Sequence, residues 1–277
     1  MNRVRLASRA GVLFNSRMTI PADSAPADEA DATDQQTPAD TCPHCLKPKA
    51  ICVCDGIVPI DNRIALLILQ HPQEQSQDLG TARLVVRHLT NAEFRIGLSW
   101  PSLSKILDRP ADPKRWAVLY LGSMQPEDFP PGREIAVLDR KGQPVADQDT
   151  ALAGIEGVVV LDGTWSQAKT LWWRNAWMLK GQRIALKPRH PSLYGKLRRE
   201  PRREALSTLE SAALLLSRLE GRPEIETALL ATFARMLERY REARGTGAHK
   251  AGPGGGSRPK GPGRPRRPGA RRPGPRQ

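Results

Sequence analysis

The segment LDGTWSQAKTLWWRNAW (161–177) places a carboxylate, a glycine, a hydroxyl and an indole at the end of an apolar run. Glycine lets the backbone turn sharply and approach a ligand closely. Thr164 can cap a following helix, whose N-terminus favours anionic groups. Asp162 would then lie at a sheet rim, and Trp165 could stack on a flat ligand. The alternative is a helix cap with core tryptophans; we favour function for Asp162 with Trp165, and the core for Trp172 and Trp177.

A second set of chemically capable residues is the cysteine cluster CPHCLKPKAICVC (42–54). A Cys-x-x-Cys pair followed by a Cys-x-Cys pair can offer four thiolates to a tetrahedral zinc ion. Two disulfides, a redox pair and an iron–sulfur cluster are weaker alternatives. His44 could replace a ligand, although four thiolates make that unnecessary. We therefore predict a closed, structural zinc site with the ligands Cys42, Cys45, Cys52 and Cys54.

Three apolar runs end in small or polar residues, which indicates one shared ligand-binding edge. Besides Asp162 and its neighbours, these are His71-Pro72-Gln73-Glu74 and Gly122-Ser123. A His-Pro turn also closes strands without chemistry, so His71 and Glu74 are weaker candidates. Neither a Gly-x-Gly-x-x-Gly fingerprint nor a Walker phosphate loop follows any predicted strand. This weighs against an ordinary dinucleotide enzyme or NTPase.

A basic block, RHPSLYGKLRRE (189–200), surrounds one tyrosine. Cations interleaved with an aromatic ring suit a phosphate backbone with a stacked base. A solvated charged loop is the alternative. The candidates here are Arg189, His190, Tyr194, Lys196, Arg198 and Arg199. Further on, Ser207 and Thr208 open a helix with Glu210 nearby, a local capping arrangement.

Strands and helices must alternate to position these residues. Continuous apolar runs predict buried strands at 63–71, 116–123, 134–139, 157–163 and 183–187. Helical spacing predicts helices at 79–89, 165–178, 204–219 and 225–243. This alternation predicts an α/β fold with a mainly parallel sheet and flanking helices.

The two ends of the chain differ from its body in composition. The net charge is +14; residues 1–20 contribute +4, residues 21–40 contribute −6 and residues 245–277 contribute +9, which leaves +7 for 41–244. We predict disorder at 1–40 and 245–277, because neither end can bury enough apolar surface. The arginine-rich tail either attracts phosphates or serves solubility. Between the ends we expect a zinc knuckle at 41–60 and one large domain at 61–244.

No apolar run approaches the ~20 residues that cross a bilayer. We therefore expect a soluble, cytoplasmic protein with no membrane association, and no obligate protein partner is evident. Residues 1–17 either form a targeting presequence or precede a start at Met18, and we favour the second interpretation.

Five separated blocks resemble the DTW-domain family, whose signature Asp-x-Thr-Trp is matched by Asp162-Gly163-Thr164-Trp165. The other blocks are the four-cysteine knuckle, LQHPQE (69–74) with GTARLV (80–85), PSLYGKLRREP (191–201) and LSTLESAA (206–213). The resemblance implies that 61–244 is a DTW catalytic domain of the SPOUT-like superfamily, with a C-terminal trefoil knot. It also implies a tRNA-uridine aminocarboxypropyltransferase, which moves the 3-amino-3-carboxypropyl group of S-adenosylmethionine to N3 of a uridine and releases methylthioadenosine. Relatives act on the variable loop or on the D-loop of tRNA; the composition rich in Ala, Arg, Pro and Gly hints at a bacterial source, so we favour the variable loop.

The resemblance also assigns residue roles. Asp162, Thr164 and Trp165 would be catalytic, with Asp162 as the base or orienting acceptor. The donor would be bound by Gly122, Ser123, Leu161, Gly163, Ser207 and Thr208. The tRNA would be bound by His71, Glu74, Tyr194, Lys196, Arg198 and Arg199, although Arg198 could also pair with the methionine carboxylate. A methyltransferase acting on RNA with the same donor and a non-catalytic zinc-containing RNA-binding protein are the alternatives.

Overall fold

The computed structural model describes residues 40–119, 124, 126–197 and 206–245. They all belong to one unit of the chain, Thr37–Gln277. The predictions for both chain ends, and those for Gly122, Ser123, Arg198 and Arg199, lie outside the described residues.

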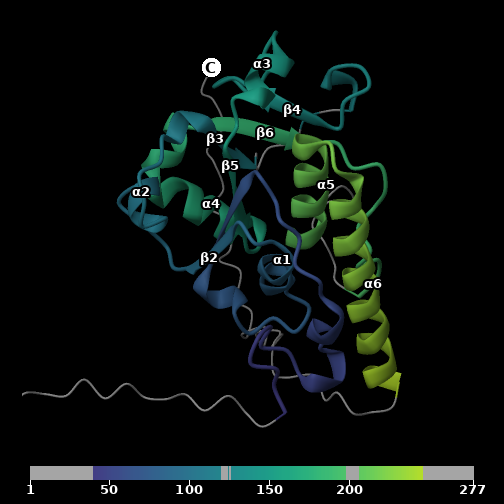
Figure 1. Ribbon diagram of the computed structural model, residues 1–277. Coiled ribbons are helices and arrows are strands. Elements are labelled where there is room, and N and C mark those ends of the chain that lie inside the picture. The colour runs from purple at the N-terminus through teal and green to yellow at the C-terminus, as the bar shows by residue number, and fades with distance from the viewer. Residues whose placement is uncertain (1–39, 120–123, 125, 198–205, 246–277) are drawn as a thin grey trace, which may run out of the picture. The chain divides into compact units, whose positions relative to one another are not determined.

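A six-stranded sheet in the order β2-β1-β5-β3-β6-β4 organises the fold (Figure 1). Neighbouring strands are parallel except for β4, which pairs with β6 in antiparallel orientation. The strands are β1 (Ala65–Gln70), β2 (Ala92–Ile96), β3 (Trp116–Leu119), β4 (Ile135–Leu138), β5 (Gly157–Asp162) and β6 (Gln182–Leu186). The mainly parallel α/β sheet predicted from the sequence is therefore confirmed.

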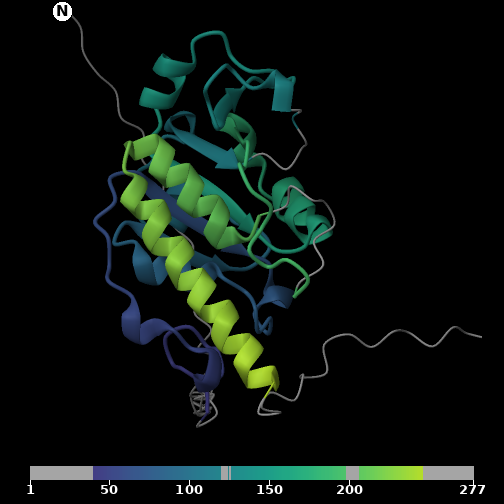
Figure 2. The same ribbon diagram turned by 90° about the vertical axis from the view of Figure 1, so that its right-hand side faces the viewer.

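Helices cover both faces of the sheet, as Figures 1 and 2 show. One face packs against α1 (Ala82–His88), α5 (Thr208–Glu220) and α6 (Pro223–Gly245), and the other packs against α2 (Leu103–Ile106) and α4 (Trp165–Arg174). Alternate residues of β1 enter the two cores, because successive side chains of a strand point to opposite faces. Burial on both faces explains why β1 and β5 read as continuous apolar runs.

Most predicted elements are confirmed, and the differences have local causes. The predicted helix 165–178 ends at Arg174 and continues as a 3-10 segment, Ala176–Lys180. The sequence did not predict β2, an edge strand whose residues are all only half-buried and so lack a continuous apolar run. It also missed α2 and α3 (Gln148–Ala153), which are too short to show a helical period. The trefoil knot stays a prediction.

The cysteine-rich segment packs against the second half of α6 rather than standing apart. Ile51 and Val53 are fully buried in this contact. Arg235 donates to the Val53 carbonyl over 3.0 Å, and Arg239 donates to the Cys52 carbonyl. The segment contains the 3-10 turns Lys49–Ile51 and Cys54–Gly56. Besides Ala176–Lys180, the other 3-10 turns among the described residues are Pro72–Glu74, Pro113–Arg115 and Pro126–Asp128.

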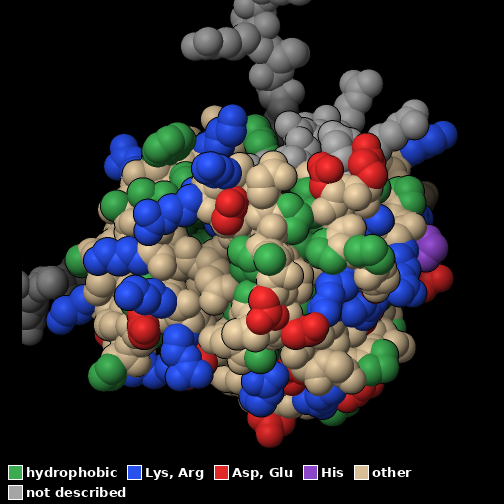
Figure 3. All heavy atoms as spheres, turned by 90° about the horizontal axis from the view of Figure 1, so that it is seen from above, with side chains coloured by type: hydrophobic (Ala, Val, Ile, Leu, Met, Phe, Trp, Pro, Cys, Tyr) green, Lys and Arg blue, Asp and Glu red, His purple; other side chains and the backbone are tan. Residues whose placement is uncertain are grey.

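The surface of the described part is rich in cations. Lys and Arg side chains are spread over the face seen in Figure 3, where Asp and Glu occupy less of the surface. Among the described residues, no helix is both long enough and apolar enough to cross a membrane.

Candidate active site at the carboxyl edge of β1 and β5

The central strands β1 and β5 form a switch point of the sheet. They are parallel neighbours, and their last residues, Gln70 and Asp162, are partners in the register. The chain leaves β1 for α1 on one face and leaves β5 for α4 on the other. In open α/β sheets, ligands bind where adjacent strands diverge in this way. The edge at Asp162 is therefore the place where the fold itself favours a site.

The Asp162 carboxylate is held by donors from two other segments. Gln70 Nε2 donates to Asp162 Oδ2 over 2.7 Å, and Thr208 Oγ1 donates to Asp162 Oδ1. Asp162 is 8% exposed, so the residue lies at the rim of the core. Because both oxygens already accept a hydrogen bond, the orientation of the carboxylate is fixed before any ligand arrives. Each oxygen keeps a further lone pair with which it can accept a substrate proton.

The residues after Asp162 build a tight strand-to-helix turn. A Cβ on Gly163 would lie 2.9 Å from Gln167 Cβ and 3.4 Å from His71 Cβ, so the close approach of these loops requires glycine. Thr164 caps α4 through a capping box, accepting from the Gln167 amide while Gln167 Oε1 accepts from the Thr164 amide over 2.6 Å. Thr164 thus fixes the start of α4, and Trp165 follows it at the rim, 37% exposed.

The loop after β1 lies beside this turn. His71 Nδ1 accepts from the Gln73 amide over 3.3 Å and so caps the short Pro72–Glu74 helix. Gln73 Oε1 in turn accepts from Gln167 Nε2 over 3.2 Å, which ties the loop to α4. Glu74 is 5% exposed and lines a cavity of about 20 Å³. His71 therefore has a defined structural role here, and its contact with substrate stays a prediction.

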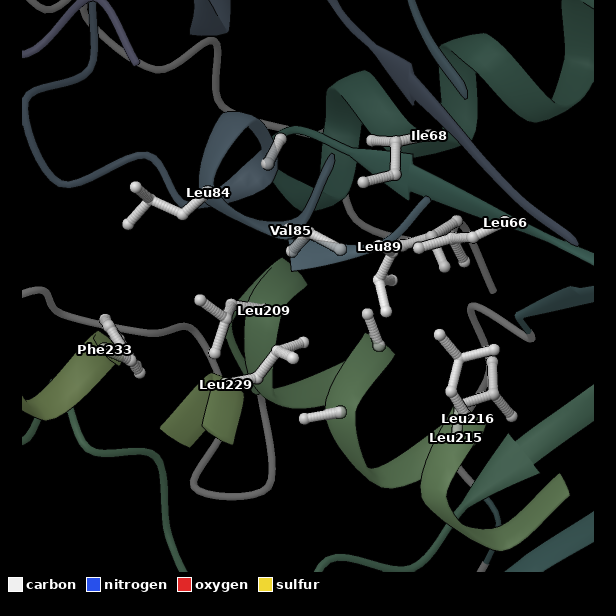
Figure 4. Packing of buried hydrophobic residues seen from close by; sticks show 14 of the residues in the cluster. Leu66, Ile68, Leu84, Val85, Leu89, Leu209, Leu215, Leu216, Leu229 and Phe233 are labelled. Atoms are coloured by element: carbon white, nitrogen blue, oxygen red, sulfur yellow. The ribbon is translucent and has the colours of Figure 1, made fainter. Parts of the chain in front are cut away.

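The N-terminus of α5 supplies the third side of the site. Ser207 caps the helix, Glu210 completes the capping box, and Thr208 in the first turn reaches Asp162. Figure 4 shows Leu209 within the packed layer that also holds Leu229 and Phe233. This packing explains how Thr208 keeps its position, because the residue next to it is anchored in the core.

Glu210 also fixes the loop that carries the basic block. Its carboxylate accepts from the Ser192 hydroxyl and from the Leu193 amide, each over 2.7 Å, and from the Ser207 amide over 2.8 Å. This buried carboxylate therefore joins the loop to the start of α5. The sequence pattern predicts only the local capping role of Glu210.

In the described part of the basic block, residues 189–197, the aromatic residue and the first arginine both have partners within the protein. Tyr194 is 2% exposed, its hydroxyl donates to the Leu79 carbonyl over 2.6 Å, and its ring meets Phe233 edge-on at 4.9 Å. The expectation that Tyr194 stacks on a substrate base is thus corrected, because the ring lies in the core. Arg189 forms an ion pair with Glu134 at 2.5 Å, and Lys196 is exposed.

The sequence did not predict the role of Lys47, which connects the cysteine-rich segment to the loop between β1 and α1. Its side chain is 3% exposed, and Nζ donates to the carbonyls of Asp78 and Gly80 over 2.7 and 2.5 Å. Burial lowers the pKa of Lys47 to about 8, although the charges of Cys45, Asp78 and Asp162 counter it. A lysine before a proline in a cysteine-rich loop is typical of a solvated turn, so only the structure could identify it.

The four cysteines meet in a geometry that suits a metal ion. Their Sγ atoms all lie within 4.8 Å of one another, none of the four forms a disulfide, and Cys45 Sγ lies 3.7 Å from Cys52 Sγ. Tetrahedral zinc with bonds of about 2.3 Å needs sulfurs roughly 3.8 Å apart, so the donor set fits. His44 is exposed and stands outside the cluster. Burial raises the pKa of Cys45 to about 11, and Cys52 and Cys42 add to the rise; a bound cation would offset this cost.

Comparison with known proteins agrees with this arrangement. The family model of the DTW domain matches residues 39–241. The chain is 30% identical over 198 residues to tRNA-uridine aminocarboxypropyltransferase 2 of Macaca fascicularis, which covers 68% of this chain and 59% of that protein. It is 29% identical to the proteins of the same name from Mus musculus, over 68% of this chain and 59% of the relative, and from Drosophila melanogaster, over 68% and 70%. The chain thus spans about three fifths of the length of the mammalian relatives. No solved structure matches.

The family match covers the cysteine cluster, both central strands, the Asp162 turn and the first turns of α5 and α6. It thus includes each segment that meets at the carboxyl edge of β1 and β5. The chain belongs to the DTW domain family.

Proposed function

We propose that this chain is a tRNA-uridine aminocarboxypropyltransferase. It would transfer the 3-amino-3-carboxypropyl group of S-adenosylmethionine to N3 of a uridine, with the variable loop as its target. The observation that carries the proposal is the Asp162 carboxylate, held by Gln70 and Thr208 at the switch point of the sheet. The relatives that bear this activity in their names support it.

The residues at this edge suit the chemistry. Uracil N3 carries a proton, and Asp162 would accept that proton while the N3 electron pair attacks the methionine Cγ of the donor. The Cγ–sulfur bond then breaks, its electron pair stays on sulfur, and the positively charged sulfonium becomes the neutral thioether of methylthioadenosine. Trp165 at the rim would stack on the uracil or face the sulfonium, whose charge an indole attracts.

The donor would lie against the segments that surround Asp162. Leu161 and Gly163 flank the carboxylate on β5 and its turn, and Ser207 and Thr208 form the start of α5. The N-termini of α4 and α5 both lie at this edge, and their amide groups favour the methionine carboxylate. The contributions of Gly122, Ser123, Arg198 and Arg199 belong to the same proposal and stay predictions.

We also propose that the cysteine cluster holds a structural zinc ion. Four thiolates complete a tetrahedral shell, so the ion would stabilise the fold and offer no open position for a substrate. Three further predictions belong to the proposal. They are a cytoplasmic location, a basic tail that attracts phosphates or serves solubility, and the lack of an obligate protein partner.

The test is to incubate the purified full chain with S-adenosylmethionine and an unmodified tRNA transcript, then digest the RNA and weigh the nucleosides. A uridine heavier by one aminocarboxypropyl group supports the proposal, whereas one heavier by a methyl group indicates the methyltransferase alternative. Asp162→Ala should abolish the product while tRNA still binds. A wild-type chain that binds tRNA and modifies nothing would indicate a non-catalytic RNA-binding protein.

A further inference from the structure

The outer face of α4 carries an exposed indole that the proposed chemistry does not use. Trp173 is 77% exposed, although tryptophan is on average a well-buried residue. The opposite side of the helix is anchored, because Ala168 and Leu171 are buried in the core between α4 and the sheet. The orientation of Trp173 toward solvent is thus fixed by packing on the other face. A single exposed apolar residue is common, but tryptophan is enriched in interfaces relative to the rest of a protein surface.

Trp173 belongs to a line of three residues that starts at the proposed active site. Trp165, Lys169 and Trp173 are spaced four residues apart, so they follow one another along one side of α4. Lys169 Nζ lies 5.3 Å from the centre of the Trp165 ring, which confirms that the first two are neighbours. We call Trp165, Lys169 and Trp173 the α4 ridge. It extends about 12 Å along the helix axis from the Asp162 turn.

The charge of the chain segment that carries the ridge indicates the class of partner. Residues 164–187 contain no Asp or Glu, and their five cations are Lys169, Arg174, Lys180, Arg183 and Lys187. Aromatic rings interleaved with cations bind single-stranded nucleic acid, because rings stack on unpaired bases while cations contact phosphates. Lysine is depleted in the cores of protein interfaces, which argues against a second copy of this chain as the partner.

We propose that the α4 ridge is the docking surface for the tRNA strand that flanks the target uridine, with Trp173 stacking on a neighbouring base and Lys169 contacting a phosphate. The proposal rests on the proposed function for the identity of the RNA. It extends that function by assigning to Trp173, outside the signature Asp162–Trp165, a second position at which an indole stacks on an RNA base. The distance from Asp162 means that the ridge sets affinity and register on the RNA, whereas the chemistry stays at the sheet edge.

The experiment measures equilibrium binding of unmodified tRNA without any donor. Trp173→Ala should weaken binding about tenfold, within the range that loss of one stacked base produces. Trp173→Phe should keep most of the affinity, because a ring remains. Lys169→Gln should reduce the slope of log K against log salt by about 0.7, the value for one phosphate contact with a single strand. Val58→Ala is the matched control, because Val58 is an equally exposed apolar side chain, and it should bind like the parent chain.

Fluorescence gives a second measurement on the same variants. Stacking on a base quenches an indole, so tRNA should quench the parent chain more strongly than Trp173→Phe. Unchanged affinity in Trp173→Ala would overturn the proposal, and so would an unchanged salt slope in Lys169→Gln. Self-association that depends on Trp173, with tRNA affinity unaffected, would assign the ridge to a second copy instead and also overturn it.

These outcomes separate the ridge from the proposed reaction. If no modified nucleoside forms but Trp173→Ala still loses tRNA affinity, the reaction is wrong and the ridge stands. If the modified nucleoside forms and Trp173→Ala binds as tightly as the parent chain, only the ridge is wrong.

Discussion

The Asp162 carboxylate owes its position to residues from three separate parts of the chain. Gln70 ends β1, Asp162 ends β5, and Thr208 begins α5, so no local sequence pattern contains all three. The order of the strands brings the first two together, and the core around Leu209 brings in the third. A site built in this way responds differently to the loss of a donor and to the loss of a helix cap.

Thr208 and Ser207 allow these two effects to be separated. Thr208→Val keeps the shape of the side chain but removes one donor to Asp162, so it should lower kcat by on the order of tenfold to a hundredfold through misplacement of the carboxylate. Ser207→Ala removes the cap of α5 and should cost about 1 kcal/mol of unfolding free energy. Urea unfolding and steady-state kinetics on both variants check this. An equal loss of kcat in both would contradict a specific role for the Thr208 hydroxyl.

Tyr194 tests the corrected interpretation of the basic block. Tyr194→Phe keeps the ring but leaves the buried Leu79 carbonyl without its donor, so we expect a loss of about 1–3 kcal/mol in unfolding free energy. Because the ring is in the core, tRNA affinity should stay at the parent value. Thermal unfolding and tRNA binding are the measurements. A loss of affinity without a loss of stability would restore the stacking role.

Residue types at strand ends predicted part of the site but not its partners. Asp162 and Trp165 could be singled out because a carboxylate and an indole interrupt an apolar pattern where a strand gives way to a helix. Gln70 could have been noticed in the same way, because it is a polar residue at the end of a buried run. Tyr194 and Lys47 could not, because a tyrosine or lysine in a polar loop carries no sequence signal that it is buried.

At the scale of the elements, buried apolar runs predicted five strands and long apolar periods predicted four helices. The sequence patterns did not predict the elements whose stability comes from neighbouring elements rather than from their own residues. The edge strand β2 is half-buried along its whole length and pairs only with β1 in the sheet. Sequence patterns also cannot give strand order, and it is the order that makes β1 and β5 neighbours.

The end of α1 carries a buried histidine that should make stability depend on pH. His88 is 2% exposed, and neither ring nitrogen has a hydrogen-bond partner among the described residues. Burial, with a smaller contribution from Arg235, lowers its pKa to about 4. The unfolded chain therefore takes up this proton first as the pH falls, since its histidine pKa is near 6.5. The unfolding free energy should fall between about pH 6.5 and pH 4, by up to about 3 kcal/mol.

His88→Leu isolates this contribution, because it removes the titrating ring and keeps an apolar side chain in the core. Urea unfolding of the parent chain and the variant at pH 7.5 and pH 5 provides the measurement. The parent chain should lose more stability than the variant on acidification. Identical losses would mean that His88 does not titrate in the buried state proposed here.

At the scale of the whole molecule, a continuous series of contacts joins the cysteine cluster to Asp162. Lys47 donates to the Gly80 carbonyl. The hydroxyl of the following residue, Thr81, accepts from the Leu209 amide over 3.1 Å. Thr208, which precedes Leu209, donates to the Asp162 carboxylate. The cluster also packs against α6 through Ile51 and Val53. Disturbing the cysteines should therefore reach the site as well as the fold.

We accordingly expect metal removal to lower both stability and turnover. The purified chain should contain one zinc per molecule, and Cys52→Ser or a strong chelator should lower the thermal midpoint and expose the segment around Ile51 to proteases. Lys47→Met separates the two consequences, because it keeps all four thiolates but leaves two buried carbonyls without their donor. It should retain zinc while hydrogen exchange near Gly80 rises and kcat falls. A metal-free chain with the parent midpoint and turnover would show that the cluster is not structural, whereas a Lys47→Met chain with full turnover would show that its effect does not pass through this lysine.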